Sequence, residues 1–268
     1  NGIEAKRASS FCCYASLLLG AISGIIIIIF MDPILKLLGS SENTYQFSKD
    51  YLFYIALGAP FIFFANTFGH AVRGEGGATA SMVGGMIGTI VNIVLDPIFI
   101  LTLNMGTAGA AIATVIGNIF GGLYYIYYLK VKSPSLTLSL KEFQILGKAA
   151  KRTVTLGIPA GINSALMSFS NIILNNKLVA YGDAPVAAMG VIIKVYLLIV
   201  FIHMGITNGI QPLLGYCFGA KNKDRFVKIF KFSGALTVII GTFLTAVYII
   251  FSREIIEFFI SDKDVIFY

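Results

Sequence analysis

Seven long stretches without a charged side chain divide the sequence, and they constrain its fold more than any other feature. These stretches cover residues 8–31, 51–72, 76–95, 97–129, 153–176, 195–220 and 232–252. About 20 apolar residues let a helix cross the roughly 30 Å hydrocarbon core of a membrane, whereas spanning β-strands give shorter, alternating segments. We therefore predict an all-α polytopic membrane protein, with transmembrane helices near residues 8–36, 46–72, 78–101, 106–130, 152–180, 185–215 and 227–253.

Basic residues are distributed unevenly between the loops on the two sides of these spans. Of the 20 Lys and Arg residues, one set of loops holds all but six, which are Lys36, Lys49, Lys177, Lys194, Arg253 and Lys263. Loops rich in Lys and Arg stay in the cytoplasm, so residue 1 is expected on the cytoplasmic side of the cell membrane and residue 268 outside. The net charge of +7 is thereby explained by topology, and no nucleic-acid partner is expected.

A polar group interrupts the third span. Asp96 lies in an apolar segment, and Asn92 precedes it by one helical turn, so both side chains share a face. Pro97 has no N–H and cannot bond the carbonyl of Ile93, and Thr114 on the returning span falls at a comparable depth. These oxygens resemble the ligands of a hard cation. The alternative is an aspartate near the membrane surface that local bonds satisfy, and the spacing alone leaves both open.

The fifth span is polar in its middle. Asn163, Asn171 and Asn175 recur at multiples of four residues and form a stripe on one helix. Lipid offers such a stripe no hydrogen-bond partners, so it is expected to line a water-filled cavity or to pack against another helix.

Residues 131–150 form the longest polar connection. Ser133-Pro-Ser135 is expected to break the helix, and an amphipathic surface helix is expected to follow.

An internal repeat relates the first span to the last one. Gly20–Leu35 aligns with Gly241–Ile256 in the same orientation, which indicates a parallel repeat. The chain is therefore expected to be an interior part of a protein of two six-helix halves.

No pattern in the sequence predicts an enzyme. His70 and His203 lack the spacing of a zinc site, no GxxxxGK[ST] motif is present, and no two carboxylates are placed to share a pocket.

Several motifs resemble the multidrug and toxic compound extrusion (MATE) transporters. They are Arg73-Gly-Glu-Gly76, Asn92–Ile100, Met105–Gly117, Leu156–Pro159 and Gln211–Asn222. The resemblance implies helices three to nine of a two-lobe, twelve-helix transporter. Residues 1–131 would be helices three to six of the N-terminal lobe, 132–150 a cytoplasmic linker, and 151–268 helices seven to nine of the C-terminal lobe.

The resemblance also implies a function. It is antiport, in which Na⁺ or H⁺ entry drives export of organic, mostly cationic compounds. The expected partners are small organic cations and the lipid bilayer, and no cofactor is expected beyond the coupling ion. Asn92, Asp96 and Thr114 match the family's cation site, which would also hold Na⁺, and Tyr51 is a weaker match. The site's helix-one partner lies outside this chain. Met167 replaces the acidic residue that another branch of the family uses in helix seven.

Substrate contacts and alternatives complete the expectations. Organic cations would contact the asparagine stripe and the aromatic faces of Phe64 and Phe169, and the full-length protein is expected to be a monomer. A flippase for a lipid-linked oligosaccharide or polysaccharide is the alternative, and it would need more basic cavity residues than Lys177 and Lys194. A structural or receptor-like membrane protein without transport is a third possibility, and it predicts that neutralising Asp96 changes stability but no flux.

Overall fold

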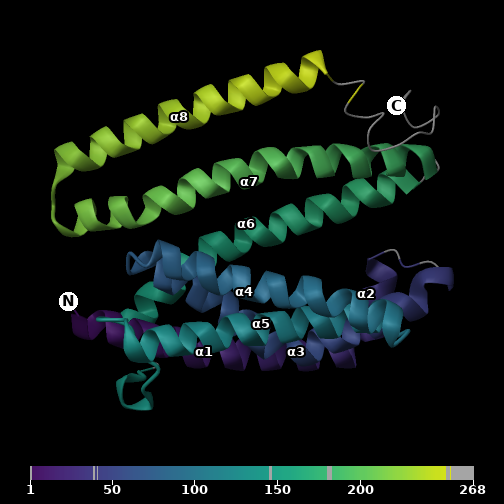
Figure 1. Cartoon of the computed structure of the whole chain (residues 1–268), viewed down its shortest axis with the longest axis horizontal. Helices are drawn as coiled ribbons and strands as arrows, with labels where there is room; N and C mark the ends of the chain where they lie inside the picture. Colours follow the sequence, from purple (N-terminus) through teal and green to yellow (C-terminus); the bar gives the residue numbers. More distant parts are fainter. Residues whose placement is uncertain are drawn as a thin grey trace. The chain divides into compact units, whose positions relative to one another are not determined.

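The computed structural model describes residues 2–38, 40, 42–144, 147–179, 183–251 and 254, with the backbone alone at 42, 43, 175, 176, 179, 183–188, 191, 194 and 195. The regular secondary structure of these residues is helical (Figure 1). The long helices are α1 (Gly2–Ile29), α3 (Glu42–Gly74), α4 (Ala78–Pro97), α5 (Gly106–Val131), α6 (Lys148–Val179), α7 (Asp183–Gly219) and α8 (Lys223–Ile250). The short elements are α2 (Met31–Leu37), the π-helix η1 (Ile98–Thr102) and the 3₁₀ turn η2 (Leu140–Glu142).

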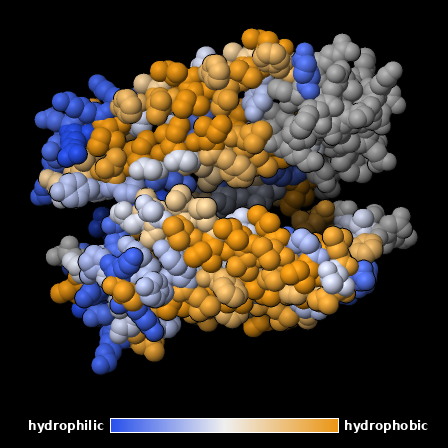
Figure 2. Space-filling view, in the orientation of Figure 1, coloured by the Kyte–Doolittle hydropathy of each residue, from blue (hydrophilic) through white to orange (hydrophobic). Residues whose placement is uncertain are grey.

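Within this described part, 7 helices are long and apolar enough to cross a membrane. Their surfaces carry hydrophobic side chains along the length, and hydrophilic ones gather at helix ends (Figure 2). In each of α6, α7 and α8, the most apolar stretch of 18 residues contains no buried residue. Its apolar side chains are therefore free to contact lipid or protein. The prediction of an all-α, multi-pass membrane protein is confirmed.

The first helix is shorter than its apolar run. We expected a span to residue 36, but α1 ends at Ile29 and a separate helix, α2, begins at Met31. Pro33 has no N–H to donate to the carbonyl of Ile29, and proline is tolerated in the first turn of the new helix.

The described residues form two compact units, residues 1–162 and 163–268. In the first unit, α3 contacts both α1 and α5, and α5 contacts α4. In the second unit, α7 contacts α8, where Nε2 of His203 lies 3.2 Å from the carbonyl oxygen of Thr237. The lobe boundaries expected at residues 131 and 150 stay a prediction.

Hydrogen bonds at the two ends of the first unit agree with the alternating direction of its helices. At one end the hydroxyl of Ser133, after α5, donates to the carboxylate of Glu75, after α3. At the other end Thr107, which begins α5, donates to the carbonyl of Phe47 in the first turns of α3, 2.9 Å away. Arg73 and Lys130, both expected in the cytoplasm, therefore belong to the same end.

The predicted amphipathic helix after Ser133 is wrong. Residues 133–143, here called the strap, are mostly extended and contain only the short turn η2. Leu136 and Leu138 alternate with polar residues and pack against the buried core, the pattern of an extended chain with one apolar face.

Side chains of α1 hold the strap in place. Ser10 donates to the carbonyl of Ser139 at 2.8 Å, and the hydroxyl of Tyr14 donates to the carbonyl of Leu138 at 2.8 Å. The ring of Phe143 packs edge-on against Tyr14, with 5.3 Å between centroids. The strap is thus part of the first unit.

Candidate functional site

A seam of glycines brings α4 and α5 together. A Cβ at Gly117 would lie 2.5 Å from the carbonyl oxygen of Gly88, and one at Gly121 would lie 3.0 Å from that of Gly84. Both distances are shorter than van der Waals contact, so the two backbones approach this closely only because the side chains are absent.

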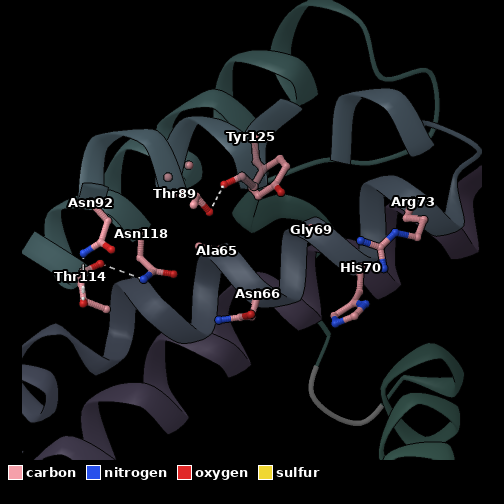
Figure 3. Close-up of a pocket in the computed structure, with 15 residues that line it drawn as sticks. Ala65, Asn66, Gly69, His70, Arg73, Thr89, Asn92, Thr114, Asn118 and Tyr125 are labelled. Carbon is pink, nitrogen blue, oxygen red and sulfur yellow. Dashed lines mark hydrogen bonds between the residues drawn. The ribbon is translucent and has the colours of Figure 1, made fainter. Parts of the chain in front are cut away.

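The next turn of the same seam places the predicted polar residues side by side. Nδ2 of Asn92 lies 3.3 Å from Oγ1 of Thr114 and 3.4 Å from Oδ1 of Asp96 (Figure 3 shows the first pair). Thr114 donates its own hydroxyl proton to the carbonyl of Ala110 at 2.9 Å, which leaves its oxygen as an acceptor for Asn92. The structure therefore joins Asn92, Asp96 and Thr114 in one hydrogen-bonded group.

Asp96 lies just before a change in helix type. α4 ends at Pro97, and the π-helix η1 follows, in which the N–H of Leu103 bonds the carbonyl of Ile98 at 2.9 Å. The absent N–H of Pro97 removes the helical donor to the carbonyl of Ile93, one turn before it. Single π-turns are frequent at functional sites, and this one borders the half-buried carboxylate of Asp96.

A polar cavity of about 390 Å³ lies between α3, α4 and α5, all within the first unit (Figure 3). Its polar lining comes from Asn66, His70, Arg73, Thr89, Asn92, Thr114, Asn118 and Tyr125. Asn92 and Thr114 lie at one end and Arg73 at the other (Figure 3), whereas Asp96 is not part of the lining.

Several cavity residues were missed from sequence. Asn66, His70 and Arg73 are four and three residues apart, so they share one face of α3, and Thr114 and Asn118 share a face of α5. Their helical spacing was the available signal. The sequence excluded His70 from a zinc site and placed Arg73 in a motif that resembles the MATE family, and it predicted a cavity role for neither.

Besides Asp96, two predicted residues of the first unit do not line this cavity. Phe64 is 7% exposed and belongs to the core cluster, where its ring packs 4.6 Å from that of Phe68. Tyr51 is 41% exposed on α3 and does not line the cavity. A role in substrate or cation binding stays a prediction for each.

The predicted substrate residues of α6 belong to the second unit. Asn163, Asn171 and Phe169 are exposed there, and Met167 is exposed as well. The side chain of Asn175 lies outside the described residues. The expectation that this stripe lines a cavity stays a prediction.

The donors near Asp96 suit a hard cation or a proton. A carboxylate, an amide and a hydroxyl supply oxygen ligands of the kind that alkali and alkaline-earth ions prefer. Because Nδ2 of Asn92 faces the other two oxygens, its amide must turn over before Oδ1 can face a metal ion. Among the described residues, no three His, Cys, Asp or Glu side chains are clustered to hold a transition metal.

Residues 3–98 and 159–268 match the sequence profile of the MatE family, which is most of the chain. The chain belongs to the MatE family. Members of this family are membrane transporters rather than enzymes, as the resemblance predicted. Two curated relatives are the multidrug export proteins MepA of Staphylococcus haemolyticus (strain JCSC1435) and Staphylococcus aureus (strain MSSA476). Each relative is 30% identical to this chain over 98% of this chain's length. The chain spans only 58% of the length of each relative.

Solved MATE structures share this fold. A MATE crystal structure in the bent conformation matches with a TM-score of 0.83 at 24% identity, over 99% of this chain and 64% of that one. An outward-facing multidrug resistance MATE transporter matches with a TM-score of 0.85 at 23% identity, over 99% of this chain and 63% of that one.

Proposed function

We propose that the full-length protein exports small organic cations in exchange for Na⁺ or H⁺. The observation that carries this proposal is the contact of Asn92 with both Asp96 and Thr114 at one end of a polar cavity. The MepA relatives are multidrug export proteins, which supports the export of small organic compounds.

In this proposal Asp96 takes up the coupling ion. A proton binds the carboxylate directly, whereas Na⁺ recruits Oγ1 of Thr114 and, after the amide turns over, Oδ1 of Asn92. Either ion cancels the charge of Asp96 and replaces the hydrogen bond from Asn92. One elementary charge moving inward through 100 mV supplies about 2.3 kcal/mol, which offsets the equal cost of moving a monovalent organic cation outward.

The test uses the full-length protein in reconstituted vesicles, with ethidium as the exported dye. Transport is measured under an imposed Na⁺ gradient and, separately, under a pH gradient, for wild type and Asp96→Asn. Asp50→Asn is the matched control, because Asp50 accepts a hydrogen bond from Gln46 at 2.9 Å and lies outside the cavity. We expect one gradient to drive export by wild type and Asp50→Asn, and Asp96→Asn to lose that dependence at equal abundance.

Thr114 provides a second, milder variant. Thr114→Val keeps the side-chain shape but removes the acceptor for Asn92, and Thr114→Ser keeps the hydroxyl. We expect the valine variant to need a higher concentration of the coupling ion and the serine variant to resemble wild type. Equal transport by wild type and Asp96→Asn would make Asp96 structural, and no transport of any cationic dye would favour the flippase.

A further inference from the structure

His203 lies where α7 and α8 run side by side in the second unit (Figure 1), and each of its ring nitrogens faces a backbone carbonyl. Nδ1 lies 2.8 Å from the carbonyl oxygen of Ile199, one turn earlier on α7. Nε2 lies 3.2 Å from the carbonyl oxygen of Thr237 on α8. Both distances are within the range of N–H···O hydrogen bonds, so the ring connects the backbones of two helices.

The two oxygens decide which form of the imidazole fits this place. A carbonyl oxygen has lone pairs and no proton, so it can only accept a hydrogen bond. A neutral imidazole has one N–H and one bare nitrogen, and the bare nitrogen would face the lone pairs of an oxygen. The imidazolium carries a proton on both nitrogens, so it is the form that donates to Ile199 and Thr237 at the same time.

The ring of His203 lies directly on the backbone of α8. A Cβ at Gly241, one turn after Thr237, would lie 3.4 Å from Nε2 and 3.7 Å from Cε1 of the ring, which is van der Waals contact. At Gly205 on α7 and Gly234 on α8, an added Cβ would meet nothing within 4 Å. The close approach at this level of the two helices is therefore made by the histidine ring.

The nearest titratable side chains along these two helices lie farther from the ring. On α7 they are Tyr196 and Lys194, seven and nine residues before His203, and the side chain of Lys194 is outside the described residues. On α8 they are Lys231 and Tyr248, six residues before and eleven residues after the carbonyl that Nε2 faces. At a rise of 1.5 Å per residue, these positions are about 9–17 Å away along the helix axes. The groups in direct contact with the two ring nitrogens are carbonyl oxygens.

We infer that His203 is a proton-binding site and that the bound proton holds α7 against α8. Ionisable side chains inside membrane spans pair with one another or with backbone carbonyls, and they mark the paths of ions and protons. Histidine is the residue type that gains and loses a proton between about pH 5 and 8. Loss of the proton leaves one of the two carbonyls without its donor, so the contact between the helices weakens as the pH rises through this range.

This inference goes beyond the proposed export function and does not rest on it. His203 belongs to the second unit, whereas Asn92, Asp96 and Thr114 belong to the first. The ligand of the second site is a proton alone, and its binding can be measured without a dye or an ion gradient.

The first test counts ring protons by NMR in the purified full-length protein with isotopically labelled histidine. A nitrogen that carries a proton shows a one-bond coupling to it, and His203→Asn identifies the signals of His203 by their loss. At about pH 5 we expect a proton on both nitrogens, and one of the two protons is lost as the pH rises.

Two glycine variants of α8 test whether the contact with Thr237 holds this proton. In Gly241→Val the branched side chain displaces the ring from α8, so the proton should be bound about tenfold more weakly, because one hydrogen bond to the charged ring is lost. Gly234→Val is the matched control and should bind the proton as wild type does. A single protonated nitrogen at about pH 5, or equal proton affinity in wild type and Gly241→Val, would overturn the inference.

The second test measures whether the proton holds the two helices together. Nitroxide labels at Leu198→Cys on α7 and Phe243→Cys on α8, both exposed positions, report the distance between the helices by pulsed electron paramagnetic resonance, in full-length protein without other cysteines. We expect a short distance at about pH 5 and a longer or broader one at about pH 8, whereas His203→Asn should give the second result at both. Gly241→Val replaces His203→Asn if the latter does not fold.

Distances that are the same with and without His203 at both pH values would refute the lock, because other contacts would then hold α7 against α8. Failure of either test would leave the proposed export function standing. Failure of dye export would likewise leave this proton site standing.

Discussion

The glycine seam between α4 and α5 gives the sharpest structural prediction, for Gly117→Ala. The added Cβ would lie 2.5 Å from the carbonyl oxygen of Gly88, where ordinary contact begins at 3.4 Å, so the helices must separate by about 0.9 Å. The bond from Asn92 to Thr114 is already 3.3 Å long, and the same separation would lengthen it beyond hydrogen-bond range. We expect a stability loss of about 1–3 kcal/mol from overpacking, together with weakened ion coupling.

The assay combines a thermal melt of the purified full-length protein with gradient-driven dye export. Gly157→Ala is the control, because a Cβ at Gly157 meets nothing within 4 Å in the described structure and alanine favours a helix. Gly117→Ala should lower the melting temperature and raise the concentration of Na⁺ or H⁺ needed for half-maximal export. A variant that keeps wild-type stability and coupling would refute the reasoning that close approach of these helices forms the site.

Two further predictions concern the ends of the first unit. Glu75→Gln removes the charge that accepts hydrogen bonds from Ser133 and Ser135, so the strap should be held less firmly, at a cost of about 1–3 kcal/mol. Protease cleavage within residues 133–143 should become faster, and unchanged cleavage would show that Glu75 does not hold the strap. At the other end, the hydrogen bond from Tyr45 and then Lys49 lower the pKa of Asp32 below its ordinary value of 3.8. A carboxylate with a lowered pKa stabilises the fold above its ordinary pKa, and this contribution is lost as pH falls below 3.8 toward the lower folded value. The melting temperature of Asp32→Asn should therefore decrease less than that of wild type as the pH falls through this acidic range. An equal decrease in both proteins would show that ionised Asp32 does not stabilise the fold.

The spans and the Asn92–Asp96–Thr114 group were predictable because both rest on local spacing. Apolar runs as long as a membrane is thick leave few alternatives to helices. Asn92 and Asp96 share a helix face by their four-residue separation, and Thr114 reaches them because the fourth span must return through the same depth.

Features that depend on contacts between distant residues were not predictable in the same way. The packing of Phe64 on Phe68 in the core is one such feature, because the face of a uniformly apolar helix that turns inward depends on its neighbours. The strap is extended because side chains of α1, more than 120 positions earlier, donate hydrogen bonds to its backbone; the bond from Tyr14 to the carbonyl of Leu138 is one of them. Arg73 follows an apolar run, as the first cation of a loop does, and only the fold brings its guanidinium to the hydroxyl of Ser81, 3.1 Å away.

The strap also changes where the smallest independently folding piece of this chain should end. A fragment cut at Val131, the last residue of α5, would leave the hydroxyls of Ser10 and Tyr14 without their acceptors and Glu75 without its donors. It would also uncover the part of the core on which Leu136 and Leu138 pack. The natural border of this folding unit therefore lies beyond the strap, after residue 143, rather than at the end of the last membrane helix.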